Sequence, residues 1–132
     1  MDSGKCRPTP RGTGMLKVLV VDDERDLADV AGVLLSAHGI ANHVVYSARE
    51  GLRAIEQDSG INAVFSDIMM PEMTGLHLAR EIKDRYPGVK VVLTSGFTSL
   101  DVLAAHDRPF VFTPKPYRIE TVIGLFTRDT ES

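Results

Sequence analysis

The sequence predicts an α/β fold in which a five-stranded parallel sheet carries helices on both faces. Short apolar segments alternate along the chain with segments of helical periodicity, which is the pattern of repeated strand–helix units. The apolar segments contain few polar residues, as strands do when both faces of a parallel sheet are covered. The expected strands begin about 20 to 28 residues apart, and five such units are too few to close a barrel.

The first strand–helix unit begins near residue 16. An apolar strand over residues 16–21 is followed by apolar residues at the spacing of an amphipathic helix, and Gly39 marks the end of that helix. The residues that we expect to face the sheet are Leu27, Val30, Ala31, Leu34 and Leu35.

The second and third units follow the same plan. A strand at about residues 41–46 precedes a helix that Ser47 and Glu50 open as a capping box. The third strand, at about residues 62–67, leads through a loop into a helix that ends before Pro87.

The last two units are less regular. A fourth strand over residues 89–95 precedes a short helix near residues 99–106. A fifth strand over residues 110–113 leads into the final helix. The apolar residues at helical spacing in that helix are Ile119, Val122, Ile123 and Phe126.

Five such units with right-handed crossovers suit the flavodoxin-like strand order 2-1-3-4-5. This order places the first and third strands together at the centre, where the direction of winding switches. Ligands bind at this position, outside the carboxyl ends of the strands.

Length and composition limit the class of protein. The chain of 132 residues suits one domain, and we expect residues 1–14 to be a flexible leader or an expression remnant before a folded domain at 15–132. A net charge of −3 leaves no basic face for nucleic acid. No apolar run is long enough to span a bilayer, and the lone Cys6 fits a reducing compartment, so we expect the cytoplasm.

Acidic residues stand at the ends of two apolar strands. Asp22 and Asp23 follow the first strand, and Asp67 ends the third. Because the carboxyl ends of neighbouring parallel strands lie side by side, the three carboxylates would share one pocket. At a separation of about 5 Å each pair would repel by roughly 3 kcal/mol, taking an effective dielectric constant of about 20. Such a pocket favours a divalent cation.

These groups suit phosphoryl transfer to a carboxylate. A carboxylate can attack a phosphoryl group when a metal screens their repulsion, and Mg²⁺ prefers hard oxygen ligands. Lys115, after the last strand, would supply a fixed positive charge, and a hydroxyl at the end of the fourth strand could donate to a phosphoryl oxygen. Taken alone, the acidic run at residues 22–24 is better explained as a helix cap; its combination with Asp67 and Lys115 favours a site.

Four motifs occur in order along the chain. They are Val20-Val21-Asp22-Asp23-Glu24, Ser66-Asp67-Ile68-Met69-Met70-Pro71 followed by Gly75, Leu93-Thr94-Ser95-Gly96, and Phe112-Thr113-Pro114-Lys115-Pro116. Together they resemble the receiver domain of bacterial two-component response regulators, over residues 15 to about 128. Each motif alone is modest, but four in this order are specific.

The resemblance implies a role for each matching residue. Asp67 would be the phosphoacceptor, taking the phosphoryl group from a phosphohistidine on a partner kinase. Asp23, Asp67 and the backbone carbonyl of Met69 would ligate Mg²⁺, and Asp22 would act through water. Lys115 would bind a phosphoryl oxygen.

The resemblance also implies which residues change conformation on phosphorylation. Ser95 is the expected switch hydroxyl because it precedes Gly96, with Thr94 as the alternative. Phe112 occupies the aromatic switch position, and the bond before Pro116 is expected to be cis. Phosphorylation would shift the population toward a state with an altered surface around the fourth helix, the fifth strand and the fifth helix.

The family implies a signalling phosphoacceptor, which catalyses only its own phosphoryl transfer and dephosphorylation. The expected partners are a sensor histidine kinase or phosphotransfer protein and a downstream protein, with no DNA-binding domain, no membrane, and a phosphorylation-dependent dimer. Met69 and Phe97 are bulky where the family controls access of the hydrolytic water, so we expect slow dephosphorylation.

Two other classes stay open. An aspartyl-nucleophile phosphohydrolase also uses a carboxylate at a strand end with Mg²⁺, but it would need a second acid two residues after Asp67, where Met69 stands. A binding module could keep the fold without being phosphorylated, although the sequence retains every charged part of the site.

Overall fold

The computed structural model describes residues 15–96 and 111–127. Five parallel strands form one sheet in the order β2-β1-β3-β4-β5, which confirms the predicted fold. The elements are β1 (Lys17–Val21), α1 (Arg25–Ala37), β2 (Ala41–Val45), α2 (Ala48–Gln57), β3 (Ala63–Asp67), α3 (Gly75–Arg85), β4 (Lys90–Ser95), β5 (Val111–Pro114) and α5 (Ile119–Thr127). The expected leader, the expected helix near 99–106 and Phe97 lie outside the described residues.

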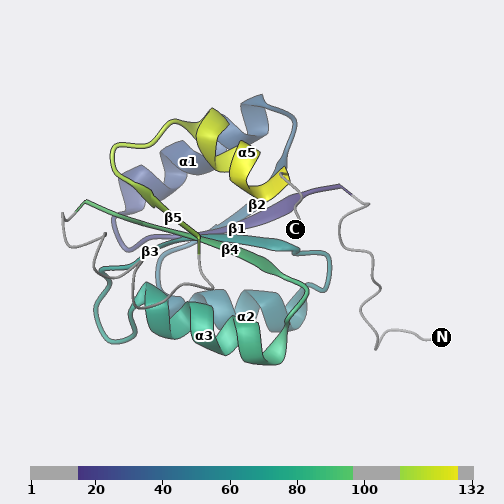
Figure 1. The fold of residues 1–132 in the computed structure, drawn as a ribbon, viewed down its shortest axis with the longest axis vertical. Helices are drawn as coiled ribbons and strands as arrows, with labels where there is room; N and C mark the ends of the chain where they lie inside the picture. The colour runs from purple at the N-terminus through teal and green to yellow at the C-terminus, as the bar shows by residue number, and fades with distance from the viewer. Residues whose placement is uncertain (1–14, 97–110, 128–132) are drawn as a thin grey trace.

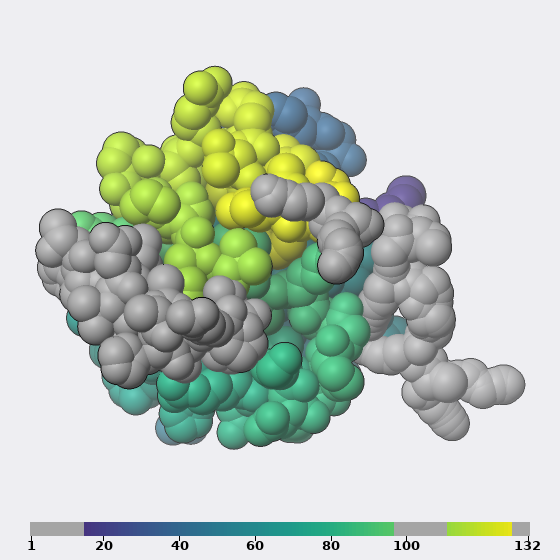
Figure 2. Space-filling model, viewed as in Figure 1, coloured from purple at the N-terminus to yellow at the C-terminus, as the bar shows by residue number. Residues whose placement is uncertain are grey.

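Two layers of helices enclose the sheet. Figure 1 shows α1 and α5 on one face and α2 and α3 on the other. The space-filling view shows α5 above and α3 below, with the edge of the sheet between them (Figure 2). In the part of the chain that the structure covers, no helix is long and apolar enough to cross a membrane.

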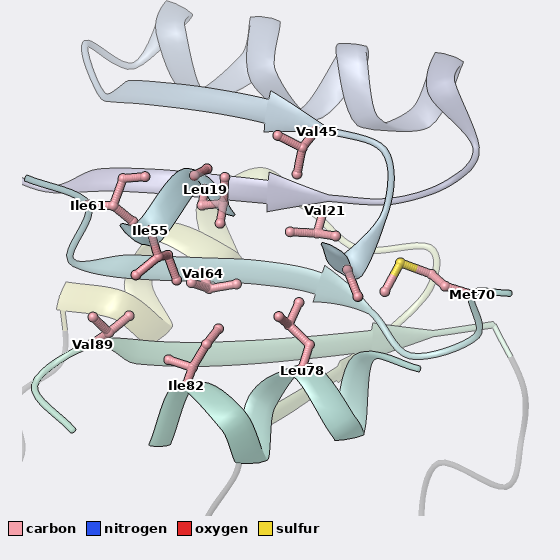
Figure 3. Packing of buried hydrophobic residues seen from close by; sticks show 12 residues of the cluster. Leu19, Val21, Val45, Ile55, Ile61, Val64, Met70, Leu78, Ile82 and Val89 are labelled. Atoms are coloured by element: carbon pink, nitrogen blue, oxygen red, sulfur yellow. The ribbon is translucent and has the colours of Figure 1, made fainter. Parts of the chain in front are cut away.

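The core lies on both faces of the sheet. Every residue of β3 is buried. On one face, Leu78 and Ile82 of α3 point at the sheet near Val64 (Figure 3). On the other face, Phe65 packs with residues of α1 and α5, among them Phe126. Each fully buried side chain of this size contributes roughly 1.5–3 kcal/mol, and this burial fixes the strands whose ends carry the polar residues.

The orientation of α1 agrees with the prediction only in part, because Ala31 and Leu35 are buried as expected but three of the other residues are not. Leu27, Val30 and Leu34, expected to face the sheet, are 42%, 52% and 38% exposed. The buried residues of the helix are Ala28, Ala31, Gly32 and Leu35. A Cβ at Gly32 would lie only 2.7 Å from Val44 Cγ2. The small residues therefore let α1 approach β2 closely, and this close packing decides which face is buried.

The strand register brings the carboxyl ends of four strands to one edge. Val21 of β1 pairs with Ser66 of β3, so the residues that follow each of them are also neighbours. Asp67 pairs with Thr94 of β4. Ser95, the next residue of β4, pairs with the last residue of β5. Residues far apart in the sequence thus meet at this edge.

Candidate functional site

Three carboxylates meet at the carboxyl edge of the sheet. One ligand oxygen from each of Asp22, Asp23 and Asp67 lies within 4.8 Å of the others. Asp22 and Asp67 are buried, whereas Asp23 is exposed. Asp22 also accepts a hydrogen bond from the backbone N–H of Glu24 at 2.9 Å, which shapes the turn into α1.

Lys115 is the cation found at this cluster in the described part of the chain. Its Nζ lies 3.6 Å from Asp22 Oδ2 and 3.6 Å from Asp67 Oδ2. Its backbone N–H donates to the Ser95 carbonyl at 3.1 Å. Two residues later, the Tyr117 ring packs edge-on against Phe65 of β3, with centroids 4.8 Å apart. These contacts hold the segment after β5 against the strands that carry the acids.

The carboxylates outnumber the cation that neutralises them. Burial, and next the charge of Asp22, raise the pKa of Asp67 to about 6, although Lys115 and the Met69 backbone N–H oppose the shift. Burial also raises the pKa of Asp22 against the Glu24 hydrogen bond and Lys115. One lysine therefore compensates two buried carboxylates incompletely.

The donor set at this edge fits a hard divalent cation. A hollow of about 360 Å³ is lined by Asp23, Glu24, Asp67, Met69, Gly96 and Lys115. The carboxylates supply only oxygen, the ligand atom that magnesium and calcium prefer. A bound cation would also relieve the repulsion that raises the pKa of Asp67. The acidic group is thus able to hold a metal.

The two hydroxyls at the end of β4 have different surroundings. Thr94 pairs with Asp67 in the sheet, and its buried hydroxyl has no hydrogen-bond partner among the described residues. Ser95 is buried as well, and its carbonyl binds the backbone of Lys115. Because successive side chains of a strand point to opposite faces, the two hydroxyls leave β4 on opposite sides.

Phe112 lies away from the carboxylates. It pairs with Leu93 of β4 and, half-buried, packs against the cluster of Ile68, Ala79 and Leu93. Its ring therefore belongs to the α3 side of the sheet. The peptide bond between Lys115 and Pro116 is cis, as the resemblance implies.

Sequence reasoning missed how the backbone of Asp67 is held. The Ser66 hydroxyl donates to the Asp67 carbonyl oxygen at 2.9 Å. On another side, a Cβ added to Gly75 would lie 2.1 Å from the same oxygen. A glycine at the first position of a helix is a poor helix former, and this was the signal in the sequence that could have revealed the contact.

Comparisons with known proteins agree with this geometry. The family model described as the response regulator receiver domain matches residues 18–120. Sensor kinase CckA of Brucella abortus (strain 2308) is 35% identical over 113 residues, which are 82% of this chain and 12% of that protein. The DNA-binding transcriptional regulator NtrC of Escherichia coli (strain K12) is 32% identical over 113 residues, 84% of this chain and 24% of that protein. The chain thus spans a quarter or less of these relatives.

Solved structures show the same fold. The receiver domain of NtrX from Brucella abortus superposes with a TM-score of 0.74 at 31% identity, covering 83% of this chain and 93% of that one. A response regulator receiver domain protein from Clostridium thermocellum gives a TM-score of 0.74 at 31% identity, covering 82% and 88%.

One expectation about partners is wrong. We expected no DNA-binding domain and an output through contact with a downstream protein. The relative NtrC is a DNA-binding transcriptional regulator that matches 84% of this chain. A segment of this kind therefore occurs within DNA-binding proteins, and the acidic charge of the segment itself carried no information about the domains to which it can be joined.

Proposed function

Because the chain belongs to the response regulator receiver family, the phosphoacceptor domains of two-component signalling, we propose that Asp67 is the residue that accepts the phosphoryl group. The observation that carries this proposal is the position of its carboxylate. It lies at the end of the fully buried β3, 3.6 Å from Lys115 Nζ and beside two further carboxylates. The family match favours this role over a phosphohydrolase.

The proposed reaction is the transfer of a phosphoryl group from a phosphohistidine of a histidine kinase. An Asp67 carboxylate oxygen attacks phosphorus, and the O–P bond forms as the N–P bond of the phosphohistidine breaks. The imidazole nitrogen leaves with the electron pair. Asp67 must be ionised to attack, and with a pKa of about 6 it is mostly ionised at neutral pH even without a metal.

We propose Mg²⁺ as the cofactor, held by Asp23, Asp67 and the Met69 carbonyl, with Asp22 acting through water. The bound ion would screen the repulsion between the carboxylates and the incoming phosphoryl group. Lys115, which lies equally far from Asp22 and Asp67, would pair with a phosphoryl oxygen as negative charge gathers there.

The proposed switch uses Ser95 and Phe112. The Ser95 hydroxyl would donate to a phosphoryl oxygen, which is consistent with its place beside the Lys115 backbone. Phe112 is only half-buried on β5, so its ring has room to turn inward. Phosphorylation would then favour a different surface around β5 and α5.

We also propose where the folded domain begins and in which compartment it acts. The folded part would start at residue 15, because the Met15 carbonyl accepts a hydrogen bond from Asn62 Nδ2 at 3.1 Å. The domain would act in the cytoplasm, as a phosphoacceptor that catalyses only its own transfer and slow dephosphorylation.

The test is phosphorylation by a small donor. The protein is incubated with acetyl phosphate and Mg²⁺, and its intact mass is measured. We expect a gain of one phosphoryl group in the wild type and none in Asp67→Asn. Asp58→Asn, which changes an aspartate at the other end of the sheet, serves as the control and should gain the same mass as the wild type. A gain that persists in Asp67→Asn would overturn the assignment.

A further inference from the structure

The first residue of α3 lies directly against the backbone of Asp67. A Cβ built on Gly75 would be 2.1 Å from the Asp67 carbonyl oxygen, 2.9 Å from its carbonyl carbon and 2.9 Å from Ile68 Cα. Real Cβ atoms essentially never approach other atoms within 3.0 Å. All three neighbours are backbone atoms, so no side-chain rotation could relieve the overlap.

Hydrogen bonds hold this carbonyl and the backbone that follows it. Ser66 donates its hydroxyl hydrogen to the Asp67 oxygen at 2.9 Å. The Gly75 N–H donates to the Ile68 carbonyl at 2.9 Å, and the Ile68 N–H donates to the Thr94 carbonyl at 2.9 Å. The end of β3 is therefore tied to α3 on one side and to β4 on the other.

Helix formation does not explain the glycine. Thr74 caps α3 by accepting a hydrogen bond from the His77 N–H, so Gly75 is the first helical residue, where alanine would be better by up to about 1 kcal/mol. Gly75 is also not among the residues with positive φ. The remaining explanation is the close approach to Asp67.

We propose that Gly75 is a positioning residue for Asp67, because its missing side chain lets α3 press against the Asp67 carbonyl and thereby sets where the Asp67 carboxylate lies. The inference rests on the proposed function of Asp67. The carbonyl carbon is bonded to the Cα that carries the side chain, so a shift of the carbonyl moves the carboxylate relative to Asp22, Asp23 and Lys115. Metal sites require their ligands within about 0.5 Å of the productive geometry.

Three glycine-to-alanine variants of the full chain test the proposal. Gly75→Ala introduces the overlap at the site. Gly32→Ala introduces a Cβ 2.7 Å from Val44 Cγ2, where the neighbours are side-chain atoms of β2 and not the backbone of Asp67. Gly124→Ala, in α5, introduces a Cβ with nothing within 4 Å. For each variant, the Mg²⁺ dissociation constant is measured by NMR titration of backbone amides, and stability is measured by urea unfolding.

We expect Gly75→Ala to weaken Mg²⁺ binding by about tenfold or more, as changes to groups that orient metal ligands do. The two controls should bind within about twofold of the wild type, including Gly32→Ala if it loses stability. Unchanged Mg²⁺ affinity in Gly75→Ala would overturn the proposal, as would an equal loss in Gly32→Ala.

A second variant decides the matter if Gly75→Ala does not fold. Ser66→Ala removes the hydrogen bond to the same carbonyl and adds no volume, and we expect threefold or more weaker Mg²⁺ binding, whereas unchanged binding would overturn the inference. Amide shifts of Asp67 and Met69 in the metal-free protein report the displacement independently of phosphorylation. If acetyl phosphate fails to modify Asp67 while these shifts differ from the controls, the proposed function fails and the positioning role stands.

Discussion

An aspartate lies beside a lysine at each end of the sheet, and the pKa values of the two aspartates are shifted in opposite directions. At the amino end, Lys17 Nζ lies 2.5 Å from Asp58 Oδ2, and both side chains are about a third exposed, at 35% and 33%. At the carboxyl end, Lys115 Nζ lies 3.6 Å from Asp67, whose side chain is 7% exposed. The hydrogen bond from Lys17 lowers the pKa of Asp58, whereas burial raises the pKa of Asp67.

The difference comes from how many carboxylates share each lysine and how well they are solvated. Among the residues that the structure describes, Asp58 is the only carboxylate paired with Lys17, and it accepts a second hydrogen bond from the Gly60 N–H at 2.8 Å. Asp67 shares Lys115 with Asp22 and lies away from water. A lysine beside a carboxylate therefore does not by itself show that the charge of the carboxylate is fully compensated. The pair at the amino end is balanced in charge, whereas the excess of negative charge at the carboxyl end favours the binding of a metal cation.

The largest expected difference between the two ends follows from removing each lysine. Lys115→Met would leave two buried carboxylates without a cation, so we expect a loss of about 3 kcal/mol in the metal-free free energy of unfolding at pH 8 and about 100-fold slower phosphorylation. Lys17→Met should lose less than about 1 kcal/mol, because exposed ion pairs contribute little, and should be phosphorylated normally. Urea unfolding and timed intact-mass measurements check both; equal losses in the two variants would contradict the comparison.

The second prediction concerns the pH dependence of the carboxyl end. The pKa of Asp67 is raised from 3.8 to about 6 in the folded protein, so between these values the folded state binds more protons than the unfolded state, and stability falls as pH rises. The shift corresponds to about 3 kcal/mol at most. We expect the metal-free stability of the wild type, minus that of Asp67→Asn, to fall between pH 4 and pH 7. A difference that rises over this range would show that Asp67 is not desolvated.

The sequence predicted the carboxyl end well because topology alone determines it. Once five apolar strands are assigned to a parallel sheet in the order 2-1-3-4-5, residues that follow β1, β3 and β5 must meet at one edge. Asp22, Asp67 and Lys115 could therefore be brought together before any side chain was placed. Their separations and burial, which decide the pKa shifts, depend on packing that the pattern of residue types does not encode.

The features that sequence reasoning missed depend on close approach between elements. Leu27 and Val30 of α1 had the spacing of a buried face, but the neighbouring stripe that contains Gly32 lets the helix approach β2 and is buried instead. The contact of Gly75 with Asp67 depends on the path of the loop between them. Hydrophobic periodicity indicates that a face will be buried; backbone separations decide which one.

Magnesium should raise the free energy of unfolding by binding at the carboxyl end of the sheet and not at the amino end. At a concentration ten times its dissociation constant, a ligand that binds only the folded state stabilises it by about 1.4 kcal/mol. We expect this gain in the wild type and in Lys17→Met at pH 8, and its loss in Asp67→Asn. Thermal unfolding with Mg²⁺ or with EDTA measures it. The same gain in Asp67→Asn would mean that the ion binds somewhere other than the acidic cluster.

The smallest effect is expected from Asp58→Asn. The pKa of Asp58 is lowered by Lys17, so the ionised form stabilises the fold above the unfolded value of 3.8, and this contribution is lost as pH falls through the folded pKa. Because the pair is a third exposed, we expect the variant to lose less than about 1 kcal/mol at pH 7 and nothing at pH 2. Urea unfolding at both values checks this. The contribution of Asp58 to stability thus falls as pH falls, whereas that of Asp67 falls as pH rises. If both contributions changed with pH in the same direction, the number of carboxylates per lysine could not explain the difference between the two ends.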